Sequence, residues 1–323
     1  MFTITLGVFL VGLSGVAHAQ AHKFQKAWPS TDFSKSTIDF STVLSGGPGK
    51  DGIPAIMNPQ FTSANKVSNL SATEPVISLE INGDAKAYPL QVLMWHEIAN
   101  DTVGGVPVSV TYCPLCNTSI VFDRRHKGRT LTFGVSGMLR KSDMIMYDHQ
   151  TESWWQQFTG EGLVGEFAGS RLTMLPARVE SFEKFKAQHP NGKVLVPNNP
   201  RARNYGRNPY VGYISSQNPF MYQGAYTLPI PKMAHVIAVG DEAWPLENLK
   251  KQKEIRHKDL VLRWAPGQNS VLDTSTTAKG RDVGNITVQK RIASYGQLED
   301  VPYAVTFAFA FNAFHPEGVL HTD

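Results

Sequence analysis

Short runs of alternating apolar and polar residues recur along the chain and predict a protein built mainly from β-strands. Residues 76–81 and 85–88 flank Asn82-Gly83, a pair that fits a two-residue hairpin turn because both positions tolerate positive φ angles. Residues 106–112 and 119–122 form a second pair of strand-like runs, rich in β-branched residues. The chain also has 27 glycines and 20 prolines, a composition that suits many strands joined by turns.

Two helices and a closing strand are expected beside these runs. A helix is predicted to begin at Pro89, because apolar residues recur three and four positions apart over residues 90–98. A second helix is predicted over residues 181–189, where two phenylalanines share one side and a proline follows. A final strand is predicted over residues 304–311, where every second residue is apolar on one face.

Parts of this pattern occur twice. In each copy a strand containing Val-Ile leads into an aromatic residue, a proline and a leucine at the predicted start of a helix. The segments that match in order are 87–90 with 243–246, 113–117 with 265–269, and 127–129 with 279–281. We interpret them as a duplicated unit of strand, helix and strand-turn-strand.

The predicted fold class is therefore α+β and β-rich, with two related halves and an insertion between them. The first half covers residues 74–135 and the second covers residues 233–323, which includes the final strand. Residues 136–232 form the intervening region. An extended N-terminal leader, residues 20–73, has little periodicity and is expected to wrap on the body of the protein.

The first residues indicate export. Residues 2–16 are apolar, and Ala17-His18-Ala19 offers small residues at the spacing of a signal-peptidase site, so a signal peptide over residues 1–19 is predicted. The apolar stretch is short for a bilayer span, which needs ~20 residues, and no integral membrane span is expected after its removal. The protein would be periplasmic or extracellular. Its net charge of +4 has no basic block, which makes nucleic acid a poor candidate partner.

Cys113 and Cys116 are the only cysteines in the chain, and they lie between two predicted strands. Two thiolates on a tight strand-turn-strand knuckle present soft donors to a single ion, and soft donors select Cu(I) or Zn(II). Copper is favoured because two cysteines suffice for near-linear Cu(I), whereas zinc needs further ligands. A metal-donor protein would then be a partner.

Two other interpretations of the cysteine pair remain open. The spacing suits a thiol-disulfide oxidoreductase with a thiol-redox partner protein, although no helix is predicted to follow Cys116 and lower a thiol pKa. A passive disulfide in a ligand-binding or interaction module would close so short a loop that it adds only ~2 kcal/mol of stability. The matching segment carries Ala265 and Gln268 at the cysteine positions, which suggests that the turn does not need sulfur to form.

His96 is the first candidate for an extra metal ligand, because it lies on the predicted helix beside Glu97 and off its apolar stripe. Other residues of ligand type follow the cysteines, although a methionine in an apolar run more often packs in a core. They are His126, His149, Met138, Met144 and Met146.

A polar stretch over residues 142–153 is a candidate rim for proton transfer or for binding a polar ligand. Its candidate residues are Asp143, Asp148, His149 and Ser153. The alternative is a turn whose polar side chains cap the backbone while Trp154 and Trp155 pack outside. The chain has no Gly-x-Ser-x-Gly turn, phosphate loop or His-Glu-x-x-His helix, so no enzyme class is assigned.

A series of motifs occurs in order along the chain. The motifs are Asp51-Gly52-Ile53-Pro54-Ala55, Ala87-Tyr88-Pro89-Leu90, Trp95-His96-Glu97-Ile98, Tyr112-Cys113-Pro114-Leu115-Cys116, Phe133-Gly134-Val135-Ser136-Gly137, Ser142-Asp143, Met146-Tyr147-Asp148, Gln150-Thr151-Glu152-Ser153 and Ala313-Phe314-His315-Pro316. Together they resemble the bacterial and archaeal family catalogued as domain of unknown function 3179, and the resemblance covers most of the predicted mature chain. It implies an exported or envelope-associated protein with this cysteine pair, and it implies no reaction. Six candidate residues fall inside the motifs, namely Cys113, Cys116, His96, Asp143, Asp148 and Ser153.

Overall fold

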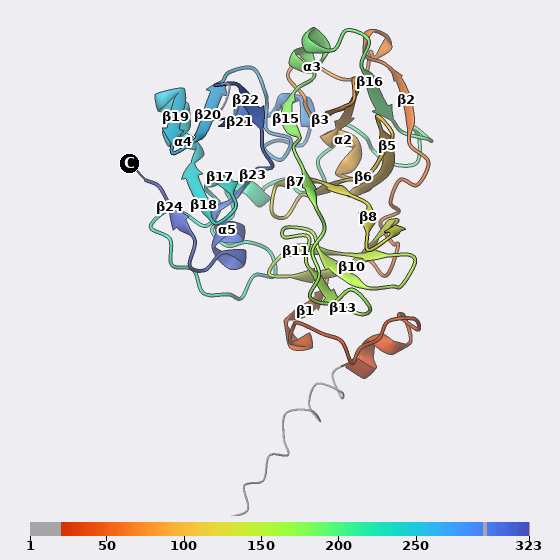
Figure 1. Cartoon of the computed structure of the whole chain (residues 1–323). Coiled ribbons are helices and arrows are strands. Elements are labelled where there is room, and N and C mark those ends of the chain that lie inside the picture. The colour runs from red at the N-terminus through yellow and green to blue at the C-terminus, as the bar shows by residue number, and fades with distance from the viewer. Residues whose placement is uncertain (1–20, 293–295, 323) are drawn as a thin grey trace, which may run out of the picture.

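The computed structural model describes residues 21–292 and 296–322 and confirms a β-rich protein with few helices. Within the described residues, five main β-sheets have a propeller-like arrangement (Figure 1). The predicted signal peptide, residues 1–19, lies outside the described residues. Short 3-10 helices occur in the connections, at η1 (Phe40–Thr42), η2 (Ala64–Lys66), η3 (Tyr213–Ser215) and η4 (Thr277–Lys279).

Two sheets lie around the cysteine pair, and the second of them holds both strands that flank it. Across sheet I the order is β15 (Arg178–Ser181), β3 (Pro75–Ile81), β4 (Asp84–Pro89), β16 (Lys193–Val196) and β2 (Gln60–Ser63). Across sheet II it is β14 (Met174–Leu175), β7 (Thr118–Asp123), β6 (Val106–Cys113) and β5 (Ile98–Val103). The predicted hairpin is confirmed, since Asn82 and Gly83 turn from β3 to β4 with φ angles of 50° and 79°.

The helix predicted at Pro89 is shorter than expected. The helix α2 (Leu90–Leu93) is a single turn, and Met94 is its C-cap. Its four residues are all buried. The apolar residues spaced three and four positions apart therefore reflect complete burial of this segment and not the apolar face of a longer helix. Ile98, which continued the spacing, instead begins β5. The second predicted helix is confirmed as α3 (Phe182–Gln188), where the Ser181 side chain accepts a hydrogen bond from the N–H of Lys184.

Sheets IV and V follow later in the chain and lie on the left in Figure 1. Across sheet IV the order is β23 (Ala304–Phe307), β17 (His235–Val239), β18 (Glu242–Pro245) and β24 (Val319–Leu320). Across sheet V it is β19 (Glu254–His257), β20 (Leu260–Ala265), β21 (Asn285–Arg291) and β22 (Leu298–Asp300). The helix α4 (Leu246–Gln252) connects the β17–β18 hairpin to β19, and α5 (Ala308–Phe314) lies between β23 and β24.

The elements of sheets I and II and of sheets IV and V come in a similar order. In both cases a hairpin leads through a helix into a three-strand meander. A later strand then pairs antiparallel with the first hairpin strand, and a second later strand, after a helix, pairs parallel with the other. The sheets do not follow the predicted boundaries of the intervening region. The strands β14, β15 and β16 lie within residues 136–232 but pair with β7, β3 and β4 of the predicted first half.

The predicted repeat of the cysteine turn is wrong. Cys113 pairs with Thr118 across a tight turn, whereas Ala265 pairs with Asn285, which leaves residues 266–284 as a long loop. The matching basic segments also differ, since residues 127–129 form the hairpin of β8 (Arg125–His126) and β9 (Arg129–Thr130) while residues 279–281 belong to that loop. A short local likeness at the end of a strand therefore did not extend to the loop, whose course is set by tertiary contacts.

The final strand was predicted too long. β23 ends at Phe307, and residues 308–314 form α5. Six of the seven residues of α5 are buried. A helix that is apolar on every side gives no 3.6-residue period, so alternate phenylalanines in this segment imitate a strand.

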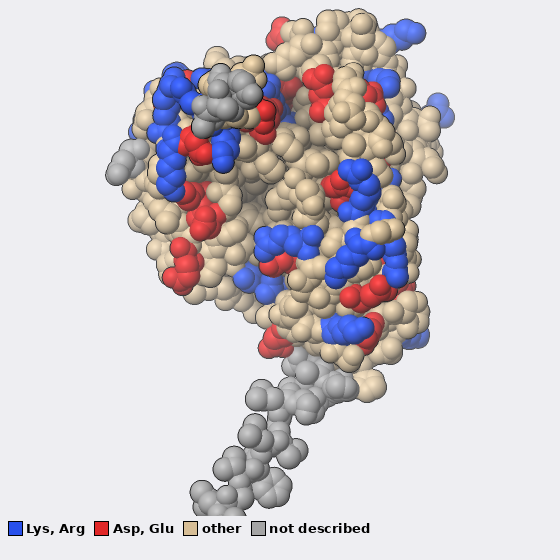
Figure 2. Space-filling model, in the orientation of Figure 1, with Lys and Arg blue, Asp and Glu red and all other residues tan. Residues whose placement is uncertain are grey.

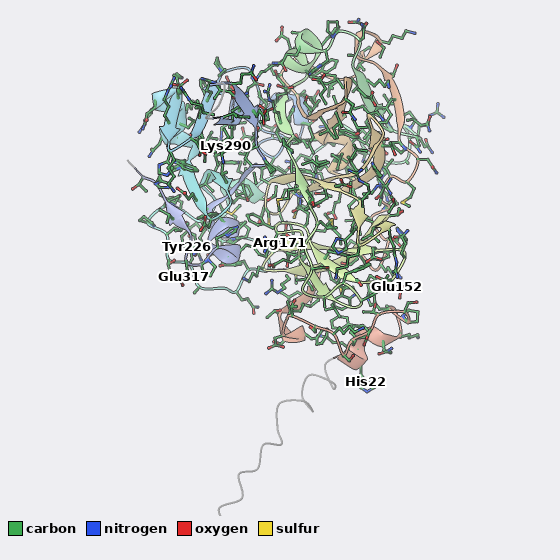
Figure 3. All side chains as sticks on the ribbon, in the orientation of Figure 1. His22, Glu152, Arg171, Tyr226, Lys290 and Glu317 are labelled. Carbon is green, nitrogen blue, oxygen red and sulfur yellow. The ribbon has the colours of Figure 1, made fainter. Side chains whose placement is uncertain are left out.

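Four of the five strands of sheet III lie between β7 and β14 in the chain, and the fifth belongs to the N-terminal segment, residues 21–45, which packs on this sheet. Across this sheet the order is β1 (Val43–Ser45), β10 (Phe133–Arg140), β11 (Asp143–Asp148), β12 (Trp154–Gln156) and β13 (Gly162–Val164). His22 and Glu152, labelled in Figure 3, mark the end of the molecule where the N-terminal segment packs on this sheet, and Ser30 N–H donates to the Glu152 carboxylate at 2.8 Å. The predicted leader thus supplies edge strands, β1 to sheet III and β2 to sheet I.

Trp154 and Trp155 are both fully buried, which corrects the expectation that they pack outside. They point to opposite sides of β12, because successive side chains of a strand alternate. Trp154 lies in a cluster with four aromatic rings of the N-terminal segment at centroid distances of 5.0–6.2 Å, those of Phe24, Trp28, Phe33 and Phe40. Trp155 packs instead against His126, Phe133 and Phe167.

The surface carries both signs of charge. On the face shown in Figure 2, lysine and arginine side chains are intermixed with aspartate and glutamate. No helix within residues 21–292 and 296–322 is long and apolar enough to cross a membrane.

We expect Trp154→Ala to release the N-terminal segment from sheet III. Loss of a buried tryptophan costs about 3–5 kcal/mol of stability, and here it also removes the ring on which four aromatic side chains pack. Urea unfolding and limited proteolysis measure the two effects. Trp155→Ala is the matched control, since it should cost similar stability without faster cleavage in residues 21–45. Equal cleavage in both variants would contradict the prediction.

Candidate functional site

The cysteine turn is the predicted strand-turn-strand knuckle. Cys113 ends β6, and the N–H of Asn117, which has a φ angle of 54°, donates to the carbonyl of Pro114 at 3.2 Å. Asparagine tolerates this left-handed conformation better than most residues. Both cysteines are free and buried, with 1% and 0% of their surface exposed.

Distant segments hold the turn in place. The N–H of Phe307 and the hydroxyl of Thr306, both from β23, donate to the carbonyl of Cys116 at 3.1 and 2.8 Å. The hydroxyl of Tyr213 donates to the carbonyl of Leu115 at 2.8 Å. Sheet IV and the loop before it therefore fix the backbone that carries the cysteines.

Asp143 joins the cysteines from the hairpin between β10 and β11. The Sγ atoms of Cys113 and Cys116 and a carboxylate oxygen of Asp143 all lie within 4.8 Å of one another. The two turn residues, Lys141 and Ser142, have φ angles of 55° and 64°, where glycine and asparagine are usual. The thiol of Cys116 donates to the Ser142 carbonyl at 3.3 Å. A strained hairpin turn thus meets the cysteine turn directly.

The carboxyl of Asp143 is bound on one side only. The side-chain amide of Gln156 and the N–H of Phe158 donate to its Oδ2 at 2.7 and 2.9 Å. Its Oδ1 is buried and accepts no hydrogen bond of standard geometry from the described residues. Burial raises the pKa of Asp143 to about 6, while the bonds from Gln156 and Phe158 and the nearby thiols act in the opposite direction.

Burial also raises the pKa of both thiols. For Cys113 the hydrogen bond with Cys116 opposes this effect, and the charges of Asp143 and Glu97 add to it. The pKa of Cys116 lies well above the usual range because of burial and the neighbouring Cys113 and Asp143. Without a bound cation the pair is therefore held as neutral thiols, which are weak nucleophiles.

Glu97 places a second buried carboxyl near the cluster. It follows α2 with a φ angle of 58° and lines a cavity of about 290 Å³ together with Leu115, Met144, Tyr210 and Tyr213. Burial, with a smaller effect of the Asp143 charge, raises its pKa to about 8. Neither a hydrogen bond nor a cation is among the groups that shift this pKa within the described part of the chain. The cavity thus has mostly apolar walls and an acid beside the metal-type ligands.

His96 does not belong to the cluster. Its Nδ1 lies 2.8 Å from the carbonyl of Pro54, and its Nε2 lies 2.7 Å from the hydroxyl of Tyr205. Both ring nitrogens therefore have partners in the loops beside β5. The prediction of His96 as an extra ligand is not supported by this geometry, and the neighbouring Glu97 faces the cavity instead.

The other residues of ligand type are dispersed. Met138 and Met144 line the cavity beside Glu97, and Met146 is buried in the main core. His126 contacts the hydroxyl of Ser170 at 3.0 Å. Among the described histidines, neither His126 nor His149 is grouped with the two cysteines.

The candidate polar rim is divided between the two ends of β11. Asp148 accepts hydrogen bonds from the N–H of Thr151 at 2.7 Å and from the indole of Trp155 at 2.8 Å. Ser153 is buried and bonds the hydroxyl of Thr151 at 2.7 Å, and the Nδ1 of His149 lies 2.8 Å from the carbonyl of Thr132. These contacts organise the turn between β11 and β12. Asp143 alone, at the start of β11, reaches the cysteines.

Sequence reasoning missed Glu97 and the meeting of Asp143 with the cysteines. Glu97 was noted only as the neighbour of His96, and no periodic pattern of apolar residues indicates that it is buried. The available signal was its position inside one of the family's motifs, but that signal did not distinguish it from His96. Asp143 was predicted to belong to the polar rim and not to the metal site, because the polar residues nearest to it in sequence lie farther along β11.

The profile of the family described as Protein of unknown function (DUF3179) matches residues 50–318, so the chain belongs to this family. The match includes the two cysteines, Asp143 and Glu97. No curated protein and no solved structure matched the chain.

We expect Glu97→Gln to change how stability depends on pH. Glutamate ionises near 4.3 in an unfolded chain but near 8 at this site, so between these values the folded protein binds more protons and loses stability as pH rises. Glutamine removes that loss. The variant should gain stability over wild type between pH 5 and pH 8, by up to about 5 kcal/mol at 1.36 kcal/mol per pKa unit.

Urea unfolding at a series of pH values, with a chelator present, measures this gain. Glu299→Gln replaces an exposed carboxylate and is the control. Parallel stability curves for wild type and Glu97→Gln would contradict a raised pKa at Glu97.

Proposed function

We propose that this member of the DUF3179 family binds a soft transition-metal ion through Cys113, Cys116 and Asp143. The observation that carries the proposal is the convergence of donor atoms from three buried residues within 4.8 Å. One oxygen of the Asp143 carboxyl, Oδ1, is also buried without a hydrogen bond of standard geometry from the described residues. Such an oxygen is costly to bury unless something else satisfies it.

The balance of charge supports the same proposal. Two thiols and two carboxyls are buried together, and no cation is among the groups that shift the pKa values of the thiols or of Asp143. A bound cation would favour the ionised form of each ligand and would reverse the effect of burial. Metal binding would therefore release protons from this site.

The donor set favours zinc. Copper was favoured from the sequence because two thiolates alone can hold Cu(I), but here a carboxylate oxygen stands beside them. Zn(II) accepts both thiolate sulfur and carboxylate oxygen, at about 2.3 and 2.0–2.2 Å. Three protein ligands would leave a position for water or a substrate, as in catalytic zinc sites. Cu(I) is the alternative ion, and a metal-donor protein is the partner that either ion implies.

The oxidoreductase alternative has less support. Thiol-disulfide exchange requires an accessible thiolate, whereas burial raises the pKa of both thiols and leaves at most 1% of either residue exposed. A passive disulfide has less support still, since both cysteines are free and each contacts the Asp143 region.

We further propose that sheets I and II and sheets IV and V descend from one duplicated unit. The shared order of hairpin, helix and meander supports this, together with the matching antiparallel and parallel partner strands. The metal ligands would then be specific to the first unit and to the sheet III hairpin inserted in it.

We expect the cysteine site of the purified protein to hold about one zinc ion when the protein is produced in medium with zinc and without added copper. Cys113→Ser and Asp143→Asn should each lower the affinity at least about ten-fold, because each removes a direct ligand. Elemental analysis and calorimetric titration measure these effects. His96→Gln is the matched control and should keep the metal, since His96 is bonded elsewhere.

Two outcomes would contradict the metal proposal. The first is a metal-free protein whose cysteines form a disulfide that is reduced near physiological potentials, which would favour the oxidoreductase. The second is an inert disulfide whose removal changes neither stability nor metal content, which would favour a ligand-binding or interaction module.

We also propose export, on the apolar start and the Ala17-His18-Ala19 site. The mature protein should begin at Gln20, because cleavage follows Ala19. Mass spectrometry of the protein from fractionated cells of the native host measures this. A chain that keeps residues 1–19, found only in the cytoplasm, would contradict the proposal.

A further inference from the structure

A second group of metal-type ligands lies on sheets IV and V. It consists of Glu242, the first residue of β18, His257, the last residue of β19, and His321, which follows β24. Their ligand atoms lie within 4.8 Å of one another, and all three residues are partly exposed. This group shares no residue with the cysteine site.

Both imidazoles converge on one carboxylate oxygen. The Nε2 atoms of His257 and His321 lie 2.8 and 2.7 Å from the same Oε2 of Glu242. The other oxygen, Oε1, is paired with the ammonium of Lys258 at 2.6 Å. The His321 contact has hydrogen-bond geometry, whereas the Nε2 of His257 is buried without a hydrogen bond of acceptable geometry. One imidazole nitrogen is therefore directed at the carboxylate without being satisfied by it.

The fold fixes the three side chains. Glu242 pairs with Val319 in the parallel contact of β18 and β24, and the N–H of His321 donates to the Ala243 carbonyl at 2.8 Å. The ring of His321 stacks on that of Trp244 at a centroid distance of 4.8 Å and an angle of 16°, and the two imidazoles lie 4.4 Å apart. Three separate segments and a buried tryptophan thus hold the group in one arrangement.

We propose that Glu242, His257 and His321 form a second site, for a divalent transition-metal ion of borderline softness such as Zn(II). Imidazole nitrogens and a carboxylate are the donors that suit this class of ion, and two histidines with one glutamate are a recurrent zinc-binding set that leaves open positions. The Oε1–Lys258 pair leaves Oε2 as the ligand oxygen.

An ion at this site would join the chain segment after β24 to β18 and β19. That link would add to the short parallel pairing of β24, which includes only two residue pairs. Binding should therefore stabilise the C-terminal part of the described chain in particular.

Zinc titration of the Cys113→Ser/Cys116→Ser chain tests the proposal apart from the cysteine site. We expect calorimetry to detect about one zinc ion per chain, and His257→Gln or His321→Gln in that background to weaken binding at least about ten-fold. His189→Gln is the matched control, because His189 forms a single pair with Glu80 at 3.9 Å without a second histidine. Magnesium, which prefers oxygen ligands, should not compete.

The wild-type background gives an independent measurement if the double cysteine variant does not fold. Zinc should raise the Tm of the wild-type protein and of His189→Gln, and His321→Gln should show a smaller rise and lose one bound ion. The proposal is overturned if the cysteine variant binds no zinc, or if His257→Gln and His321→Gln bind it as tightly as the control. Failure of the cysteine site alone would leave this result unchanged.

Discussion

The hydrogen bonds from Phe307 and Thr306 to the carbonyl of Cys116 join two parts of the protein that are distant in sequence. They attach the cysteine turn of sheet II to the edge strand of sheet IV, and the sheet III hairpin meets the same turn from another direction. The largest core cluster accordingly includes both cysteines together with residues of sheets I, II, III and IV. The turn is buried because it is where these sheets meet.

That burial determines the chemistry of the site. Two thiols, Asp143 and Glu97 are buried together, so each of their pKa values is raised and ionisation of each is more costly than in water. The cost is electrostatic, and a buried cation is the group that relieves it most directly. The strained turn at Lys141 and Ser142 fits this picture, since it sacrifices backbone stability to place Asp143 against the thiols.

The parts of the fold that were predicted correctly are those set by local chemistry. Asn82-Gly83 specifies its turn by backbone preference, and Ser181 begins α3 by capping it. α5 was missed because a helix buried on all sides has no periodic polar face. Asp143 was grouped with Asp148 because they are neighbours in sequence, yet the ends of a six-residue strand lie about 17 Å apart at roughly 3.3 Å per residue. Glu97 lies near the cysteines because it directly precedes β5, which pairs with β6, and the N–H of Tyr112 donates to the Glu97 carbonyl at 2.8 Å, a register that the apolar pattern does not show.

The connection between Cys116 and β23 also has a consequence for the order in which the protein is assembled. Bringing together residues so far apart in sequence lowers the conformational entropy of the chain before any stabilising contact has formed. We therefore expect the contact between Cys116 and β23 to form late in folding. Residues 113 and 116 leave the ribosome well before residues 306 and 307, so the nascent chain presents two accessible thiols until its last sheets are complete. The period of greatest exposure to oxidants and to competing metals is therefore the time before sheet IV closes over the cysteine turn.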